Sequence, residues 1–265
     1  MLEINNLSCG YDDKVVIREM NCQIKHKEIV GIIGPNGSGK TTLLRAITRV
    51  LKPKQGEILL KERDIRQMSL KALAREIAVV AQSLPGGSVS VEEFVLLGRI
   101  PHLNRLQFLE TKQDLAVAER AMSLTDSLRI KDQFIEEISG GERQLAQIAR
   151  ALAQEPTLLL LDEPTAHLDI THQVGVLDLI KRLNREFGLT VIMVLHDLNL
   201  ASAYCDRLIL LHNGGIHQQG SPKQVLTYQT IEEVYQTVVV VKQDPLTSRP
   251  YIFLVSEAQR HTARK

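Results

Sequence analysis

An α/β fold, with antiparallel strands at its start and a helical block inserted into it, is the fold class that this 265-residue sequence predicts. Short apolar runs of strand length alternate with segments of helical periodicity, which is typical of strands joined by crossover helices. Between about residues 83 and 156 this alternation gives way to helices with polar starts. The block therefore interrupts the alternating pattern, which resumes after it.

The first part of the chain predicts strands and then a helix. Leu2–Ile4 and Lys14–Ile24 alternate apolar and polar residues, as antiparallel strands do. Glu28–Ile33 is a continuous apolar run of strand length. Thr41–Val50 spaces its apolar residues at helical intervals, so a helix is expected there.

The helical block carries its own start signals. A short strand is expected around Ala78–Ala81, before the block. Ser90 is followed three positions later by Glu93, and Thr111 by Asp114. Both pairs have the spacing of a capping box, in which the first side chain caps the helix and the acid bonds back.

Strand patterns return after the block. Leu158–Leu161 and Thr190–Leu195 are apolar runs that predict buried strands. Leu208–His212 and Ile216–Gln219 flank Asn213-Gly214-Gly215, which predicts an antiparallel hairpin. The tail beyond about residue 237 alternates short strands and turns.

Composition excludes several functional classes. Lys plus Arg is 32 against 31 for Asp plus Glu, and 44% of residues are apolar, so neither disorder nor nucleic-acid binding by bulk charge is expected. The apolar runs are too short to span a bilayer, and the acidic start predicts no signal peptide. Three unpaired cysteines, Cys9, Cys22 and Cys205, indicate a reducing compartment and neither a disulfide framework nor a zinc site.

A glycine-rich stretch after the third expected strand predicts phosphate binding, because it matches G-x-x-x-x-G-K-[ST]. Its glycines let backbone N–H groups close around phosphate oxygens, at the positive end of the next helix. The lysine adds a charge on the β- and γ-phosphates, and the following threonine can hold Mg²⁺. The alternative is a turn without a ligand. The candidate residues are Gly34, Pro35, Asn36, Gly37, Ser38, Gly39, Lys40, Thr41 and Thr42.

Two carboxylates follow the apolar run Leu158–Leu161. The carboxyl ends of strands in open α/β sheets are where ligands bind. Asp162 is therefore a candidate magnesium ligand, and Glu163 a candidate general base for an attacking water. Alone, the pattern also fits a strand that simply leaves the core.

Two further motifs specify the family. Ile138-Ser-Gly-Gly-Glu-Arg-Gln144 precedes an apolar helix, and Asp162-Glu-Pro-Thr-Ala-His-Leu-Asp169 follows about twenty residues later. With these, nearly the whole chain resembles the nucleotide-binding subunits of ATP-binding cassette (ABC) transporters. The resemblance implies a P-loop NTPase core over about 1–82 and 157–236, an inserted helical subdomain over about 83–156, and a β extension over about 237–265. ATP and Mg²⁺ are the implied ligands.

The resemblance also implies a homodimer. Ser139, Gly140 and Gly141 resemble the family signature, which receives the γ-phosphate of the ATP held by the opposite subunit. A serine cap and two glycines before a helix suit a second anion site. The motif has Glu142 where the commonest form has glutamine, and a carboxylate beside phosphate makes this residue a poorer contact.

Four single residues match further family positions. Gln82 resembles the glutamine that touches Mg²⁺ and senses the membrane subunit, although an isolated glutamine is also ordinary polar surface. His196 resembles the switch histidine at the γ-phosphate, and Asp169 the aspartate that crosses the dimer interface. Tyr11 resembles the aromatic that stacks on adenine, or else packs in a turn.

The chain carries one cassette and no long coiled coil, which favours a transporter ATPase with separate membrane subunits. Two segments, Leu96–His102 and Ala166–Gln173, resemble those of the ATPases of importers for iron–siderophore, haem and cobalamin. Residues from about 83 to 105 would then receive a helix of the membrane subunit, although Pro101-His102 also suits a helix-ending turn. Expected partners are two permease subunits and, indirectly, a binding protein, at the cytoplasmic face of the inner membrane. An exporter ATPase, another importer class and a non-transport ABC ATPase are the alternatives.

Overall fold

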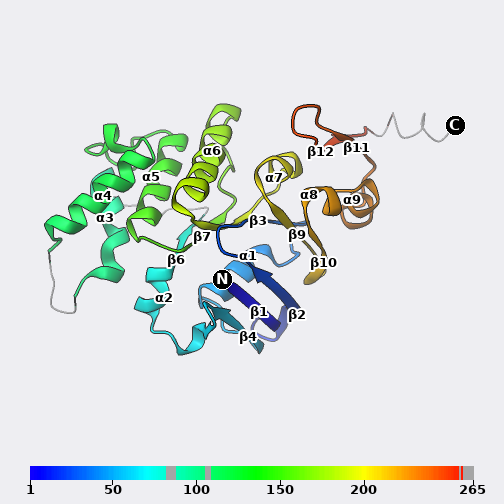
Figure 1. Ribbon diagram of the computed structural model, residues 1–265, viewed down its shortest axis with the longest axis horizontal. Coiled ribbons are helices and arrows are strands. Elements are labelled where there is room, and N and C mark those ends of the chain that lie inside the picture. Colours follow the sequence, from blue (N-terminus) through cyan, green and yellow to red (C-terminus); the bar gives the residue numbers. More distant parts are fainter. Residues whose placement is uncertain (82–87, 105–108, 257, 259–265) are drawn as a thin grey trace. The chain divides into compact units, whose positions relative to one another are not determined.

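The computed structural model describes residues 1–81, 88–104, 109–256 and 258. The chain divides into two compact units, whose helices and strands are labelled in Figure 1. Unit 1 comprises Met1–Glu62 and Met193–Lys265, and unit 2 comprises Arg63–Ile192. Strand β8 (Thr190–Val194) carries the chain from unit 2 into unit 1. The domain boundaries implied by the family resemblance stay a prediction.

Unit 1 begins with the predicted antiparallel strands. β1 pairs antiparallel with both β2 and β4, and Leu2, Ile4, Leu7 and Cys9 of β1 are almost fully buried. In chain order the unit contains β1 (Leu2–Tyr11), β2 (Lys14–Ile24), β3 (Ile29–Ile33), α1 (Lys40–Ile47), β4 (Gln55–Leu60), α7 (Leu198–Tyr204), β9 (Arg207–His212), β10 (Gly215–Gly220), α8 (Pro222–Val225), α9 (Tyr228–Tyr235), β11 (Val239–Gln243) and β12 (Pro250–Leu254).

The second strand group of unit 1 confirms the predicted hairpin. β9 and β10 pair antiparallel, and β3 pairs parallel with β9. Asn213 and Gly214 have φ values of 50° and 81°. A two-residue hairpin turn of type I′ needs positive φ at both central positions, which asparagine and glycine tolerate. The Asn-Gly turn therefore returns the chain as β10, which pairs with β9 on the edge away from β3.

Helix α1 ends three residues before the predicted Val50. The Thr48 hydroxyl donates to the carbonyls of Leu44 and Arg45 at 3.0 and 3.2 Å, so it competes with the helical pattern at the last turn. Arg49 then adopts a φ of 60°, in the left-handed region that ends a helix. Val50 is consequently 76% exposed, although it fits the apolar periodicity.

Unit 2 contains the helical block, whose helices α3, α4 and α5 lie side by side (Figure 1). They share a core that includes Phe94, Met122, Ile138 and Ala149. Strands β6 and β7 pair parallel, and the Leu158–Leu161 run is fully buried as predicted. In chain order the unit contains β5 (Arg63–Asp64), η1 (Ile65–Gln67), α2 (Leu70–Glu76), β6 (Ile77–Val80), α3 (Val91–Leu96), η2 (Leu97–His102), α4 (Lys112–Leu124), η3 (Leu128–Ile130), α5 (Gly140–Ala153), β7 (Leu158–Asp162) and α6 (Ile170–Phe187).

Both predicted capping boxes are confirmed. Ser90 accepts a bond from the Glu93 N–H, and the Glu93 carboxylate accepts from the Ser90 N–H, at the start of α3. Thr111 and Asp114 make the same exchange at the start of α4. Each box satisfies backbone donors that a helix start otherwise leaves without partners.

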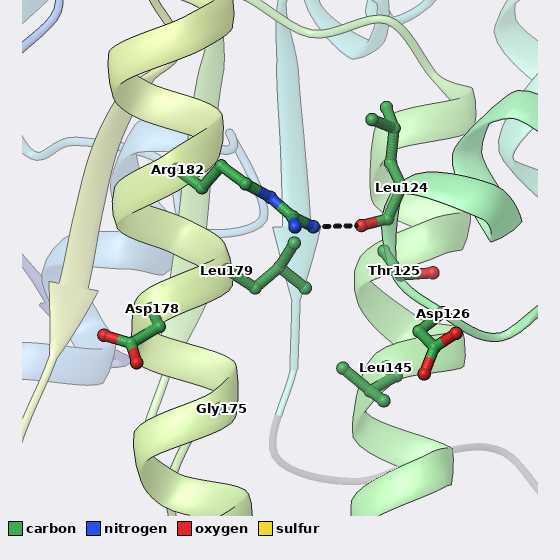
Figure 2. Close-up of a pocket in the computed structure, with 8 residues that line it drawn as sticks. All are labelled: Leu124, Thr125, Asp126, Leu145, Gly175, Asp178, Leu179 and Arg182. Atoms are coloured by element: carbon green, nitrogen blue, oxygen red, sulfur yellow. Dashed lines mark hydrogen bonds between the residues drawn. The ribbon is translucent and has the colours of Figure 1, made fainter.

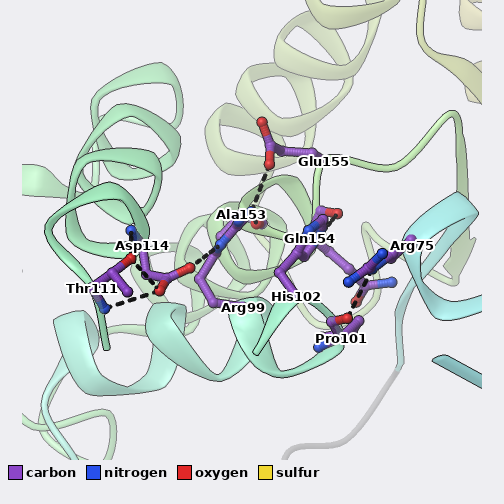
Figure 3. A network of polar contacts seen from close by, with 9 residues as sticks. All are labelled: Arg75, Arg99, Pro101, His102, Thr111, Asp114, Ala153, Gln154 and Glu155. Atoms are coloured by element: carbon purple, nitrogen blue, oxygen red, sulfur yellow. Dashed lines mark hydrogen bonds and ion pairs between the residues drawn. The ribbon is translucent and has the colours of Figure 1, made fainter. Parts of the chain in front are cut away.

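Asp114 also belongs to a buried charge network (Figure 3). The Arg99 side chain is only 4% exposed, and its Nε lies 3.0 Å from Asp114 Oδ1. Its Nη1 donates to the Ala153 carbonyl and to Glu155, each at 2.7 Å. Burial alone would raise the pKa of Asp114, but the hydrogen bonds from Thr111 and the pairing with Arg99 outweigh it and lower this pKa to about 2.

The same network fastens η2 to the end of α5. A Cβ added to Gly98 would lie 2.2 Å from the Arg150 carbonyl oxygen, so only glycine allows this approach. The His102 ring Nε2 lies 2.9 Å from the Gln154 carbonyl. The polar residues of the segment Gly98–His102, Arg99 and His102, thus each have hydrogen-bond partners within unit 2.

Helix α6 lies beside the end of α4, with a pocket of about 340 Å³ between them (Figure 2). The Arg182 Nη2 donates to the Leu124 carbonyl at 2.7 Å across this pocket. Leu145 and Leu179 supply apolar lining.

Within the described residues, no helix combines the length and apolarity needed to cross a membrane.

Candidate functional site

The glycine-rich loop between β3 and α1 has the backbone shape that the motif predicts. Gly34, Gly37 and Gly39 have φ values of 144°, 80° and 105°, which side-chain-bearing residues rarely adopt. A Cβ on Gly34 would lie 2.2 Å from the Leu211 carbonyl oxygen. Nothing lies within 4 Å of the corresponding position on Gly37, so the loop is open there.

Ser38, Lys40 and Thr42 are buried polar residues of this motif. The Lys40 Nζ donates to the carbonyls of Gly34 and Pro35 at 2.8 and 3.0 Å, which folds the side chain back over the loop. Ser38 Oγ is buried without a hydrogen-bond partner among the described residues. A buried hydroxyl normally has a partner, so this atom indicates a place for an additional polar group.

His196 follows β8, at the edge of unit 1 where the loop starts. The Leu195 N–H donates to the Ile32 carbonyl at 3.1 Å, and Ile32 lies two residues before Gly34. Asp197 then caps α7 by accepting from the backbone N–H groups of the helix's first turn. The exposed His196 therefore lies between the end of β8, which is bonded to β3 two residues before Gly34, and the start of α7.

Tyr11 lies at the tip of β1 and contacts helix α1. Its hydroxyl accepts a bond from Arg45 Nη1 at 2.9 Å, and the guanidinium carbon lies 5.8 Å from the ring centroid. The ring is 40% exposed. Part of Tyr11 therefore stays accessible although it contacts Arg45 of α1.

A residue far away in the sequence also contacts this loop. The Gly34 N–H is hydrogen-bonded to the hydroxyl of Tyr235, at the end of α9. Burial raises the pKa of Tyr235 to about 12, so the phenol stays neutral. The two residues are two hundred positions apart, and no local pattern marks Tyr235.

In unit 2, Asp162 ends strand β7 and Glu163 follows it. Glu163 has a φ of 55°, and its carbonyl accepts a bond from the Ala166 N–H at 3.1 Å. A left-handed conformation at a residue other than glycine costs about 1–3 kcal/mol and is concentrated at functional sites. The sharp turn fixes the direction in which the Glu163 backbone leaves the strand.

The Ser139-Gly140-Gly141 motif begins helix α5 as predicted. Ser139 Oγ donates to Glu142 Oε2 at 2.8 Å and accepts from the Glu142 N–H, which makes a capping box. Hydrogen bonds from Ser139 lower the pKa of Glu142, and Arg129 lies 3.0 Å from the same carboxylate. Glu142 is therefore engaged as a structural cap with its charge paired.

Asp169 caps helix α6 by accepting from the His172 N–H at 2.9 Å. Unit 1 thus holds Tyr11, the phosphate loop and His196, and unit 2 holds Asp162, Glu163, the Ser139 motif and Asp169. Gln82, together with residues 83–87 and 105 of the predicted membrane-subunit surface, lies outside the described residues.

Comparison with known proteins identifies the family. Residues 17–166 match the ABC transporter family. The chain is 41% identical over 251 residues to the protein of Bacillus subtilis named "Probable siderophore transport system ATP-binding protein YusV", covering 94% of this chain and 90% of that protein. The chain belongs to the ABC transporter family. The ferric enterobactin transport ATP-binding protein of Escherichia coli is 39% identical over 258 residues, covering 97% and 95% of the two chains.

Solved ABC structures have the same fold. An ABC transporter described as of metal-chelate type, in an inward-facing conformation, has a TM-score of 0.85 at 27% identity and covers 97% of this chain and 98% of its own. A dimeric ATP-binding cassette bound to ADP and phosphate has a TM-score of 0.72 at 28% identity, covering 83% and 98%. The predicted α/β fold and the ABC resemblance are confirmed, and the chain is an ATP-binding subunit and an ATPase.

The residues of this ABC subunit suit a nucleotide with its metal. The positive-φ glycines open the loop backbone toward phosphate oxygens, Lys40 supplies a cation, and the buried Ser38 hydroxyl lacks a partner among the described residues. Hydroxyl and carboxylate oxygens, which Thr41 and Asp162 carry, are the donor type that Mg²⁺ prefers. The loop therefore fits the phosphates of ATP, and each of these oxygens is by its own chemistry a donor that fits Mg²⁺.

Proposed function

We propose that this chain is the ATPase subunit of an importer for metal chelates, in the class of iron–siderophore, haem and cobalamin. The observation that carries the proposal is the likeness, over more than nine-tenths of the chain, to transport ATP-binding proteins for a siderophore and for ferric enterobactin. The phrases Leu96–His102 and Ala166–Gln173 support the same class.

The phosphate loop would bind the ATP triphosphate. Lys40 would leave its loop carbonyls and donate to the β- and γ-phosphates, where a charge-assisted hydrogen bond is stronger than a neutral one. Tyr11 would stack on the adenine through its exposed face. Gly34 to Thr42 would surround the phosphates with backbone N–H groups.

Hydrolysis needs a water molecule deprotonated and aimed at the γ-phosphorus. Glu163 would accept the proton from that water, and His196 would contact the γ-phosphate as negative charge moves onto the leaving group. Thr41, Asp162 and Gln82 would hold Mg²⁺, which when bound neutralises charge on the β- and γ-phosphates. A general base of this kind contributes about 10²–10⁴-fold in rate.

We further propose that two copies of the chain bind two ATP molecules between them. Ser139, Gly140 and Gly141 of one copy would receive the γ-phosphate held by the other, and Asp169 would cross the interface. The dimeric state of a related cassette supports this arrangement. Because ATP binds the closed dimer more tightly than the open one, binding drives closure and hydrolysis allows reopening.

The partners follow from the class. Two integral-membrane permease subunits would form the pore, a binding protein would deliver the chelate, and the chain would lie at the cytoplasmic face of the inner membrane. Closure would move the docked permease subunits through the helical block.

The test is purification of the tagged chain from host membranes in mild detergent. We expect a multi-span permease to co-purify, and vesicles holding the complex to take up a ferric siderophore when ATP and the binding protein are supplied. The Glu163→Gln complex is the matched control, which should assemble but take up none. Recovery of the chain without a membrane partner, or ATP-driven release of the chelate from cells, would contradict the proposal.

A further inference from the structure

The first turn of helix α6 carries a His-Gln pair that the proposed mechanism does not use. His172 and Gln173 follow the cap residue Asp169 by three and four positions. Residues at that spacing in a helix's first turn lie close to the cap. Their contacts reach two segments that the proposed dimer needs.

His172 contacts Asp169 twice. Its backbone N–H and its ring Nδ1 each lie 2.9 Å from Asp169 Oδ1. The backbone bond is an ordinary helix cap, which many residues at position 172 would retain. The ring bond is specific to this side chain and fixes the direction of the carboxylate.

The other side of the His172 ring covers the start of helix α5. A Cβ added to Gly141 would lie 2.1 Å from Cδ2 of the ring and 2.6 Å from Nε2. The ring therefore occupies the space that a side chain at position 141 would fill. A side chain at position 141 would therefore require the His172 ring to move.

Two further contacts join the same segments. Gln173 Nε2 donates to the Leu168 carbonyl at 2.9 Å, which holds the chain just before Asp169. The Leu168 side chain approaches Gly140, where an added Cβ would lie 4.0 Å from its Cδ2. The Leu168–Asp169 segment and the Gly140–Gly141 helix start are thus packed as one surface within unit 2.

We propose that His172 is a positioning residue that holds the Asp169 carboxylate and the Gly141 end of α5 in one rigid surface, so that both engage the opposite subunit and its ATP together. This inference rests on the proposed dimer, in which both segments face the partner copy. The side chains of His172 and Asp169 are 45% and 66% exposed, as a surface that closes on a partner requires. His172 itself need not touch nucleotide.

The two contacts of the ring can be separated by substitution. Alanine at position 172 removes both contacts. Asparagine keeps a donor for Asp169 but is too short to cover Gly141, whereas phenylalanine keeps a ring over Gly141 without a donor. Ile170→Ala is the matched control, because Ile170 lies in the same turn, is 79% exposed and is outside these contacts.

The experiment measures ATP-dependent dimerisation by sedimentation in the Glu163→Gln background, where hydrolysis does not consume the dimer. Nucleotide affinity of the monomer is measured in parallel by calorimetry. We expect His172→Ala to raise the dimer dissociation constant at least fivefold and to leave monomer affinity for ATP within twofold. His172→Asn and His172→Phe should each recover part of the loss, and Ile170→Ala should match the parent.

A dimer constant for His172→Ala equal to that of the parent overturns the inference. A parallel loss of ATP affinity in His172→Ala, with no recovery in either partial substitution, also overturns it, because the role would then be general folding. Absence of any ATP-dependent dimer in Glu163→Gln itself refutes the proposed function and removes this inference with it.

Discussion

Replacing Arg99 by methionine removes the centre of the buried network in unit 2 (Figure 3). The side chains of Arg99 and Asp114 are 4% and 7% exposed, so the change leaves a carboxylate buried without its cation. Breaking a buried ion pair costs about 3–5 kcal/mol. Asp114 keeps its hydrogen bonds from Thr111, and the half-exposed Glu155 loses little, so we expect about 3 kcal/mol.

Urea unfolding followed by circular dichroism at pH 7 measures this loss. With a slope of about 3 kcal/mol per molar urea, the unfolding midpoint should fall by about 1 M. Arg99→Met combined with Asp114→Asn is the control, and it should recover more than half of the loss because no carboxylate is stranded. A midpoint for Arg99→Met within 0.2 M, or about 0.6 kcal/mol, of the wild type would refute the reasoning.

The Arg99–Asp114 interaction should also make the free energy of unfolding depend on pH. The folded pKa of Asp114 is about 2, below its ordinary value of 3.8, so its contribution is fully present above about pH 4 and is lost as the pH falls toward 2. The difference in stability between wild type and Arg99→Met should therefore narrow below about pH 4. A difference that widens there would contradict the assignment.

Three further changes test the packing and the loop. Gly98→Ala places a Cβ 2.2 Å from the Arg150 carbonyl oxygen, so it should lower the free energy of unfolding by about 1–3 kcal/mol, measured by thermal unfolding. Gly175→Ala is the control, because its Cβ has open space, and it should not lower the free energy of unfolding. Lys40→Ala should weaken ATP binding about 10- to 100-fold by calorimetry, since a hydrogen bond to a charged group is lost; unchanged affinity would count against the loop assignment. Tyr11→Ala should weaken ATP binding severalfold while Tyr11→Phe retains it, and equal losses in both would argue against stacking on adenine.

Local patterns in the sequence predict the elements that depend on neighbouring residues. Asn213-Gly214 specifies the hairpin because its turn needs positive φ at consecutive positions. The Ser90 and Thr111 boxes appear as predicted because all their partners lie within three residues. The end of α1 differs from the prediction because Arg49 adopts a left-handed φ of 60°, which apolar periodicity does not indicate.

Contacts between distant residues could not be predicted in this way. Arg99 meets Glu155 and Ala153 more than fifty positions along the chain, and Tyr235 meets Gly34 across two hundred. The candidate site residues came from motif and resemblance, and their roles stay predictions. The packing of His172 on Gly141 could not be predicted either, because the sequence around each residue does not indicate the other.

In the proposed mechanism, Glu163 activates the water that hydrolyses ATP. Phosphate release from labelled ATP, measured for the wild type and for Glu163→Gln alongside calorimetric ATP binding, tests it directly. We expect phosphate release at least about 100-fold slower for Glu163→Gln, with ATP affinity preserved and a dimer trapped by ATP. A normal rate of phosphate release from Glu163→Gln would contradict it.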